Sequence, residues 1–290
     1  MRPEGLKTKI FLDSGDPGET RKALEVLGFL DGQTTNPSLI AKNPETAGKK
    51  FSQSEIFDFY EKVVQEIFRL IPEGSVSIEV YADSSTSSED MLKQGRDFFL
   101  WLPPSPNSNA GGAHIKYPTT AEGLLAAERS IKEGLRVNMT LCFTQEQAAA
   151  VYAATRGAKK GQVFVSPFVG RLDDRGQDGM DLIANIMRMY EQGDGHVEVL
   201  TASVRSVGHM HRAIELGSDI ITAPLKVLKA WHEGKTEPAS EIELKHIPYV
   251  ELDPGKDWQE YNLQHELTDK GIEKFTQDWN SLITRTITDK

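Results

Sequence analysis

Short runs of mainly apolar residues alternate with amphipathic stretches along most of the chain. Eight of these runs have the length and the residue content typical of strands. They are Lys9–Ser14, Gly32–Asn36, Val76–Ala82, His114–Pro118, Arg136–Phe143, Gln162–Val169, His196–Val204 and Asp219–Ala223. Strands that alternate with helices form parallel βαβ units. Eight such units predict a closed (β/α)8 barrel of the α/β class.

The helices between the strands have recognisable starts. Pro17 is placed to be the first residue of a helix, a position that proline fits because it needs no backbone N–H. Ser52 and Glu55 form a capping box ahead of apolar residues at helical spacing. Thr144 and Gln147 repeat this pattern before an alanine-rich helix. These signals strengthen the alternation of strands and helices.

An open, doubly wound sheet is the structural alternative. That fold usually carries a glycine-rich phosphate loop after its first strand, and residues 13–17 match neither G-x-G-x-x-G nor the Walker A pattern. Two segments lie outside the alternation: the turn formers of Pro103–Gly112, and a polar tail from Trp231 that ends in a helix over Thr268–Ile283. We therefore expect one barrel domain over residues 1–290, with residues 231–290 as a C-terminal helical extension that packs on the barrel.

Composition narrows the class of protein. With 290 residues, 38% apolar content and a net charge of −10, the chain can bury a sizeable core and does not favour nucleic acid or an anionic membrane as its main partner. Cys142 is the sole cysteine, and the seven histidines lack metal-ligand spacing, so we expect no disulfide and no metal site. Residues 1–9 lack the apolar core of a signal peptide, and no apolar run has the length of a bilayer span. We expect a cytoplasmic protein.

Lys116 lies in a strand-like run that ends at Pro118, ahead of a helix expected over residues 121–133. Side chains in such a run are normally buried, and burying an ammonium group costs free energy. A desolvated lysine gives up its proton more readily, and the free amine can then attack a carbonyl and form a Schiff base. The plainer interpretation is that Lys116 pairs with a carboxylate or extends to solvent. The residues around it decide between the two.

Polar residues recur where the expected strands end. In a barrel of this kind, side chains at the C-terminal ends of the strands meet above the packed core, and this face holds the active site. Seven of the eight expected strands carry polar groups there, namely Asp13, Thr34, Thr35, Asn36, Glu79, Lys116, Asn138, Thr140, Ser166, Ser203 and Arg205. Singly, each has a structural explanation, such as a helix cap or a satisfied backbone group. Packing alone does not explain so many together.

Five motifs along the chain resemble those of the transaldolases. They are the T-T-N-P-S-L run within residues 30–40, the lysine motif Ile115–Pro118, the phosphate-side loop Ser166–Arg171, the second phosphate element Ala202–Arg205 and the C-terminal helix Leu267–Phe275. The resemblance extends from Ile10 to Leu282 and is specific because the motifs occur together and in order. It implies a TIM barrel that needs no cofactor and no metal.

The resemblance also implies a reaction. Lys116 would form a Schiff base with a ketose phosphate, fructose 6-phosphate or sedoheptulose 7-phosphate, and keep a dihydroxyacetone unit. An aldose phosphate, erythrose 4-phosphate or glyceraldehyde 3-phosphate, would accept that unit, as in the pentose phosphate pathway. Asp13 would move the proton of the substrate hydroxyl at the broken C–C bond. Glu79 and Thr140 would hold a water that shuttles protons, and we expect Glu79 to contact Lys116 through that water.

The remaining site residues implied by the resemblance bind substrate. They are Asn36, Asn138, Ser166, Phe168, Arg171, Ser203 and Arg205, of which Arg171, Ser203 and Arg205 would bind the phosphate. Tyr117, Thr119 and Val204 depart from the residues expected beside the motifs, which leaves substrate length and acceptor preference open. Members of the family form dimers or larger rings, so a homo-oligomer is compatible with the resemblance.

Two alternative functions stay open at this level. A fructose-6-phosphate aldolase-like enzyme would use the same lysine and release dihydroxyacetone to water. That branch resembles shorter chains with Gln in place of Glu79 and Tyr in place of Phe168, so both positions favour transaldolase. The other alternative is a sugar-phosphate-binding protein that has lost catalysis. Binding alone does not need a nucleophilic amine, and the combination of Lys116, Asp13 and Glu79 favours an enzyme.

Overall fold

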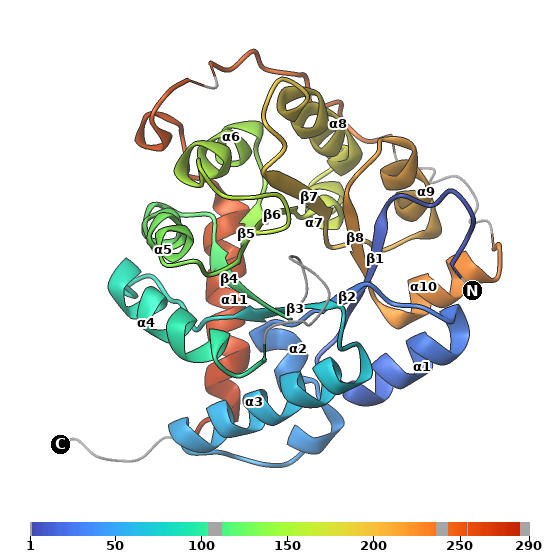
Figure 1. Ribbon diagram of the computed structural model, residues 1–290, viewed down its shortest axis with the longest axis vertical. Coiled ribbons are helices and arrows are strands. Elements are labelled where there is room, and N and C mark those ends of the chain that lie inside the picture. The colour runs from blue at the N-terminus through green and yellow to red at the C-terminus, as the bar shows by residue number, and fades with distance from the viewer. Residues whose placement is uncertain (1, 104–111, 236–242, 254, 285–290) are drawn as a thin grey trace.

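The computed structural model describes residues 2–103, 112–235, 243–253 and 255–284. Its strands are parallel and pair in chain order, and β1 closes on β8 to form a barrel (Figure 1). The strands are β1 Lys9–Asp13, β2 Gly32–Thr34, β3 Ser75–Glu79, β4 Gly112–Pro118, β5 Val137–Cys142, β6 Val163–Pro167, β7 Val197–Thr201 and β8 Ile220–Ala223. The expected (β/α)8 TIM barrel is confirmed.

Helices cover the outside of the barrel, and each strand is followed by at least one of them (Figure 1). The outer helices are α1 Pro17–Leu27, α3 Gln53–Leu70, α4 Ser88–Phe99, α5 Ala121–Lys132, α6 Gln145–Ala154, α8 Gly179–Tyr190, α9 Val207–Glu215 and α10 Leu225–His232. Additional short elements lie in the connections: α2 Pro37–Ala41, η1 Pro44–Thr46, α7 Val169–Asp173 and η2 Trp258–Glu260. The last helix is α11 Glu266–Leu282.

The helix starts agree with the sequence signals except at one place. Pro17 is the first residue of α1, and the Ser52 side chain caps α3 in a reciprocal capping box with Glu55. Thr144 caps α6 as expected, but the second half of its box is wrong, because the Gln147 side chain accepts a hydrogen bond from Phe143 N instead of Thr144 N. The amide nitrogen of Gln147 donates to Leu263 O and Thr268 Oγ1, both of which are distant in sequence.

Several strands end earlier than the apolar runs suggest. The expected second strand extends to Asn36, yet β2 stops at Thr34 because the Asn36 side chain accepts from Leu39 N and caps α2. The expected seventh strand extends to Val204, yet β7 stops at Thr201. Ser203 then takes a φ of 58°, a left-handed conformation that departs from extended strand geometry. Ser203 and Arg205 are therefore loop residues.

Aromatic rings close the barrel interior below the polar strand ends. Phe11 of β1 and Phe164 of β6 meet edge to face with centroids 6.1 Å apart, and the His114 ring stacks on Phe164 at 4.0 Å. Gly32 makes room for this layer, since a Cβ there would lie 2.5 Å from the Phe11 ring. These rings form a packed floor for any site at the C-terminal ends of the strands.

His114 is a structural residue of this floor. Its Nε2 lies 2.9 Å from the carbonyl oxygen of Gly161, which can only accept, so Nε2 carries the hydrogen and Nδ1 accepts from Ser75 Oγ at 2.8 Å. Burial lowers the pKa of His114 well below its usual range. The folded protein therefore holds this side chain in its neutral form.

We expect His114 to make the protein less stable in mild acid. Unfolding raises the pKa of His114 back to about 6.5, so the unfolded chain binds an extra proton below that pH and the free energy of unfolding falls by up to about 1.4 kcal/mol per pH unit. Chemical denaturation between pH 7 and pH 5 should show this slope, and His114→Gln should reduce it. The matched control is His211→Gln on the exposed surface of α9, which should keep the wild-type slope.

Residues 243–253 run along the outside of the barrel, ahead of the segment that crosses the C-terminal face. Side-chain amides hold this segment: Gln145 of α6 exchanges two hydrogen bonds with the backbone of Val250, and Asn185 of α8 donates to the carbonyl of Ile247. In Figure 1 the segment passes outside α8 and α6, and α11 then runs behind the barrel. The polar segment before residue 254 thus lies away from the strand ends, and α11 lies over them.

Part of the expected organisation falls outside the described residues. Residues 104–111 of the Pro103–Gly112 segment lie outside them, as do residues 236–242 and 285–290 of the C-terminal extension.

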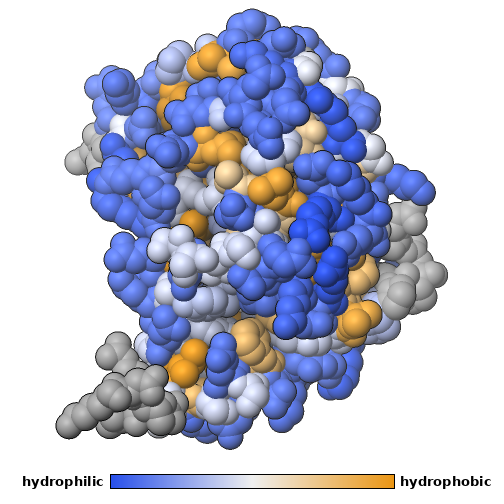
Figure 2. Space-filling model, turned by 90° about the vertical axis from the view of Figure 1, so that its left-hand side faces the viewer, coloured by the Kyte–Doolittle hydropathy of each residue, from blue (hydrophilic) through white to orange (hydrophobic). Residues whose placement is uncertain are grey.

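In the described ranges, no helix combines the length and the apolar content needed to cross a bilayer. The face shown in Figure 2 is mainly hydrophilic, and its hydrophobic side chains form small separate groups. That face therefore presents no extended apolar patch.

Candidate active site

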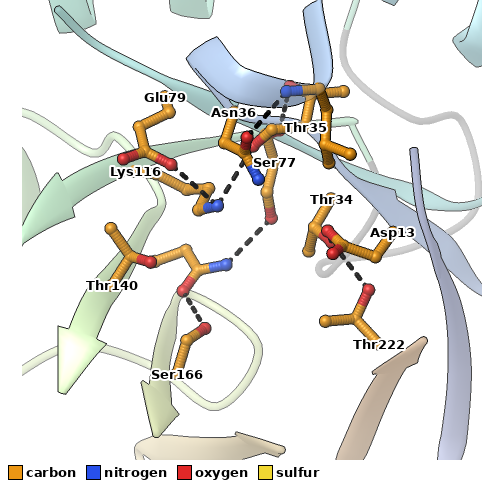
Figure 3. Close-up of polar contacts among 12 residues, drawn as sticks. Asp13, Thr34, Thr35, Asn36, Ser77, Glu79, Lys116, Thr140, Ser166 and Thr222 are labelled. Carbon is orange, nitrogen blue, oxygen red and sulfur yellow. Dashed lines mark hydrogen bonds and ion pairs between the residues drawn. The ribbon is translucent and has the colours of Figure 1, made fainter. Parts of the chain in front are cut away.

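Lys116 and Glu79 form a buried ion pair inside the barrel (Figure 3). They are register partners on the adjacent strands β4 and β3, and their side chains are 3% and 5% exposed. Lys116 Nζ lies 2.9 Å from Glu79 Oε2 and donates to the carbonyl of Thr35 at 3.0 Å. The lysine is therefore buried and paired with a carboxylate.

The direct contact corrects the expectation that a water separates the two groups. Because Glu79 and Lys116 are opposite each other in the β3–β4 register, both side chains enter the interior at the same level and meet without an intervening molecule. Glu79 Oε2 has Lys116 as its ion-pair partner, although it meets strict hydrogen-bond geometry with no described residue. Burial raises the pKa of Glu79, and Lys116 opposes that shift.

Tyr60 of α3 supports this pair from outside the barrel. Its hydroxyl accepts from the backbone N–H of Glu79 at 3.0 Å and bonds with Thr35 Oγ1. Thr35 and Glu79, which both contact Lys116 Nζ, are therefore linked through the buried hydroxyl of Tyr60. Burial raises the pKa of Tyr60, so the hydroxyl remains protonated.

Asp13 lies at the end of β1 and is oriented by two threonines (Figure 3). Thr34 Oγ1 donates to Asp13 Oδ1 at 2.7 Å and lies 2.6 Å from Thr222 Oγ1 of β8. Burial raises the pKa of Asp13, while Lys116 lowers it. A carboxylate with a raised pKa accepts a proton more readily, which suits a group that must take and return one.

Asn138 is held in a chain of side-chain hydrogen bonds. Ser166 Oγ donates to Asn138 Oδ1 at 2.6 Å, and Asn138 Nδ2 donates to Ser77 Oγ at 3.0 Å (Figure 3). Thr140, on the same strand, has a buried hydroxyl with no hydrogen-bond partner in the described part of the chain. A buried hydroxyl of this kind commonly interacts with a ligand or an ordered water.

Arg171 extends from α7 into the same cavity without an anionic partner. Its guanidinium lies 5.1 Å from the ring centroid of Phe168 and 5.4 Å from that of Phe275. No hydrogen bond or ion pair joins it to another described residue. Burial lowers the pKa of Arg171, although a guanidinium remains charged in proteins. A desolvated and unpaired cation of this kind is suited to bind an anion bidentately.

Arg205 is different, because Asp174 already pairs with it. The terminal nitrogens Nη1 and Nη2 each lie 2.6 Å from an oxygen of Asp174. Gly170 allows the side chain to pass, since a Cβ at this position would be 2.6 Å from Arg205 Nε. Gly170 N also donates to the carbonyl of Ser203 at 3.2 Å, which joins the two expected phosphate elements.

A cavity of about 270 Å³ connects these groups. Its lining includes Asp13, Thr34, Asn36, Ser38, Lys42, Lys116, Ser166, Phe168, Arg171, Ser203, Arg205, Thr222, Lys274, Phe275 and Asp278. Of the site residues expected from sequence, Glu79, Asn138 and Thr140 do not line it directly but lie against those that do. A larger cavity of about 540 Å³ lies at the other end of the barrel, where Lys9, Ser75 and Phe164 contribute to its wall. That end of a TIM barrel normally serves stability.

The family model for Transaldolase/Fructose-6-phosphate aldolase matches residues 10–286. The chain belongs to this family. A probable transaldolase of Dehalococcoides mccartyi is 38% identical over 274 residues, which are 94% of this chain and 99% of that protein. A probable transaldolase of Brucella ovis is 37% identical over 271 residues, 93% of this chain and 96% of that protein. Among solved structures, 3-hexulose-6-phosphate synthase from Salmonella typhimurium has a TM-score of 0.49 at 10% identity, covering 95% of this chain and 99% of that one.

The departures from the transaldolase motifs lie away from the cavity. Tyr117 points outward, where its hydroxyl bonds Ser130 of α5 at 3.0 Å. Gly95 of α4 accommodates it, since a Cβ there would lie 2.0 Å from the Tyr117 oxygen. Thr119 donates to the carbonyl of Thr140 at 2.8 Å, and Val204 is buried. None of the three residues lines the cavity, so they affect the packing around the barrel.

Other cavity residues are not identified by the motifs. Thr222, Lys42 and Asp278 are examples, and Lys274 lies within the C-terminal motif without being among the expected site residues. Phe275 lies on the apolar face of the C-terminal helix and is indistinguishable in sequence from a residue that packs on the barrel. Among the described residues, no group of three or more His, Cys, Asp or Glu side chains could hold a metal ion. Burial raises the pKa of Cys142 to about 12, so this thiol is not a nucleophile.

Proposed function

We propose that this protein is a transaldolase, which moves a dihydroxyacetone unit from a ketose phosphate to an aldose phosphate through a Schiff base on Lys116. The observation that carries the proposal is the buried amine of Lys116, 2.9 Å from a carboxylate and in one cavity with a second carboxylate and an unpaired guanidinium. A binding protein has no need of this amine. The chain belongs to the Transaldolase/Fructose-6-phosphate aldolase family, and similar proteins are named probable transaldolases.

Formation of the Schiff base requires the neutral amine, because only the free electron pair attacks a carbonyl. Glu79 takes the proton from Lys116 across their direct contact, and the raised pKa of Glu79 favours this transfer. Lys116 Nζ then adds to C2 of the ketose phosphate, and loss of water gives a protonated imine. The water that enters or leaves at this step is held by the Glu79 carboxylate and by the Thr140 hydroxyl, which has no hydrogen-bond partner among the described residues.

Asp13 drives the cleavage. It removes the proton from the C4 hydroxyl, the C3–C4 bond breaks, and its electron pair moves into the imine to form an enamine. The aldose phosphate leaves, and a second aldose phosphate takes its place. The enamine attacks the new aldehyde, and Asp13 returns the proton to the resulting oxyanion. Water then hydrolyses the imine and releases the new ketose phosphate.

The phosphate occupies the end of the cavity formed by Arg171, Ser203 and Arg205. Arg171 supplies a desolvated cation without a competing anion, and Arg205 is fixed by Asp174 at the rim. Asn138 and Ser166 bind the hydroxyl groups of the dihydroxyacetone unit together with Asn36, whose amide nitrogen bonds no described residue. Because both the leaving and the accepting aldose carry a phosphate, one anion site serves both half-reactions.

The experiment that tests this function is the release of glyceraldehyde 3-phosphate from fructose 6-phosphate, measured with and without erythrose 4-phosphate. We expect release to depend on the acceptor, because the dihydroxyacetone unit stays on Lys116 until an aldehyde collects it. Equal rates in both conditions would mean that water completes the cycle, as in a fructose-6-phosphate aldolase. Absence of release in both conditions would contradict the transaldolase activity and the aldolase activity alike.

A further inference from the structure

The middle of α11 is joined to α2 across the mouth of the active-site cavity. Ser38 Oγ donates to Asp278 Oδ2, and Lys274 Nζ pairs with Asp278 Oδ1. We refer to Ser38, Lys274 and Asp278 as the clasp. All three residues line the cavity that also contains Lys116 and Asp13. The clasp therefore lies at the boundary between the reacting groups and solvent.

Asp278 does not have the properties of a substrate-binding group. Both of its oxygens already have a partner, and its side chain is only 19% exposed. A carboxylate beside a phosphate dianion would also repel it unless a cation such as Lys274 neutralises the charge. The arrangement suits a positioning role, in which Asp278 connects two elements of the fold.

Both ends of α11 are attached independently of the clasp. At the start of the helix, Thr268 Oγ1 donates to the carbonyl of Leu141 at 3.0 Å and accepts from Gln147 Nε2 at 2.9 Å. At its end, Phe51 N donates to Leu282 O, and Thr284 N donates to Phe51 O, both at 2.8 Å. Between the two clasp residues of the helix, Thr276 Oγ1 donates to the carbonyl of Ala82 at 2.9 Å. Loss of the clasp should therefore loosen the centre of the helix without detaching the helix from the barrel.

The centre of α11 lies directly on residues of the cavity. A Cβ at Gly271 would lie 2.6 Å from Leu141 Cδ2 and 2.8 Å from Arg171 Nη1, so the backbone approaches as closely as glycine permits. One turn further on, Phe275 contacts the guanidinium of Arg171. An outward movement of this part of the helix would open a path for water from the helix surface to the cavity.

We propose that the clasp holds the centre of α11 closed over the dihydroxyacetone–Lys116 intermediate and so selects transfer to an aldose phosphate over hydrolysis by water. This inference rests on the proposed transaldolase function. The intermediate is an imine in equilibrium with an enamine, and water that reaches the imine carbon releases free dihydroxyacetone and returns Lys116. Closed elements that exclude water protect such intermediates in many enzymes.

The test measures the lifetime of the intermediate in water. The protein is loaded with fructose 6-phosphate, freed of excess donor by rapid gel filtration and left in buffer without acceptor. Borohydride reduction at successive times, followed by mass spectrometry, gives the remaining fraction of protein that carries the three-carbon adduct. Ser38→Ala and Asp278→Ala should lose the adduct about tenfold faster than wild type, as expected when one charge-assisted hydrogen bond no longer holds the closed state.

Controls separate the clasp from general damage. Gln277→Ala changes the same helix at an exposed side chain that donates to Glu273, and it should keep the wild-type lifetime. Discharge of the adduct by erythrose 4-phosphate, measured in parallel, gives the ratio of water to acceptor reaction, which a merely structural defect would not raise. Ser38→Ala removes only a hydroxyl, so it keeps the proposal testable if Asp278→Ala fails to fold.

The outcomes are distinct. Wild-type lifetimes in both clasp variants would overturn this inference and leave the transaldolase proposal intact. A wild-type protein that forms no adduct, or loses it to water as fast as to the acceptor, would overturn the transaldolase proposal itself.

Discussion

Replacement of Lys116 by methionine is expected to abolish transfer of the dihydroxyacetone unit, because the thioether cannot form an imine with the ketose. The loss should exceed the roughly 10²–10⁴-fold effect typical of an acid–base group. No other amine in the described part of the chain forms an ion pair with a buried carboxylate beside Asp13, so none can replace Lys116 as the nucleophile. The measurement is glyceraldehyde 3-phosphate release in the presence of erythrose 4-phosphate. Phosphate binding by Arg171 should persist in the variant, which calorimetry with fructose 6-phosphate can show. Residual activity would contradict the role of Lys116.

The same substitution should change how stability depends on pH. Without the Lys116 cation, burial raises the pKa of Glu79 against less opposition, although Arg171 still lowers it, so the folded protein keeps this carboxyl protonated while the unfolded chain ionises it. A folded-state pKa above the unfolded value of about 4.3 gives stability that is fully present below that pH and lost as the pH rises. The free energy of unfolding of Lys116→Met should thus fall by up to about 1.4 kcal/mol per unit above pH 5. The double variant Lys116→Met/Glu79→Gln is the control and should not show this slope.

Replacement of Asp13 by asparagine is expected to lower kcat by about 10²–10⁴-fold with a smaller effect on KM. Asparagine fills the same space and can still accept the hydrogen bond from Thr34, so the site should remain assembled. It cannot take the proton of the C4 hydroxyl, and the C3–C4 bond then stays intact. Steady-state kinetics with both substrates would measure the loss.

Trapping shows which step has failed. Borohydride reduction of Asp13→Asn in the presence of fructose 6-phosphate should leave the intact hexose phosphate on Lys116, whereas wild type should yield the three-carbon adduct. Glu79→Gln is the matched comparison, because it impairs formation of the imine and should reduce the yield of any adduct. Equal yields of the three-carbon adduct in Asp13→Asn and wild type would show that another group accepts the proton.

The local signals in the sequence were sufficient for the fold because barrel elements are specified by nearby residues. Alternation of strands and helices, helix caps such as Ser52, and proline at the start of α1 all act over a few residues. The errors follow from the same principle. The Gln147 oxygen accepts from Phe143 N, while its amide nitrogen donates to the distant residues Leu263 and Thr268. Strands β2 and β7 end before their apolar runs do, since Asn36 caps α2 and Ser203 takes a left-handed φ.

The sequence by itself determined the barrel, the family and the polar groups at the strand ends, because period, turn chemistry and motif order are properties of neighbouring residues. Only the tertiary structure decided how those groups meet. The register of β3 and β4 places Glu79 directly against Lys116. Thr222 reaches Thr34 across 188 positions of sequence, and Asp278 reaches Ser38 across 240. Contacts over such separations depend on barrel closure and on the path of the C-terminal segment, and no local pattern encodes either one.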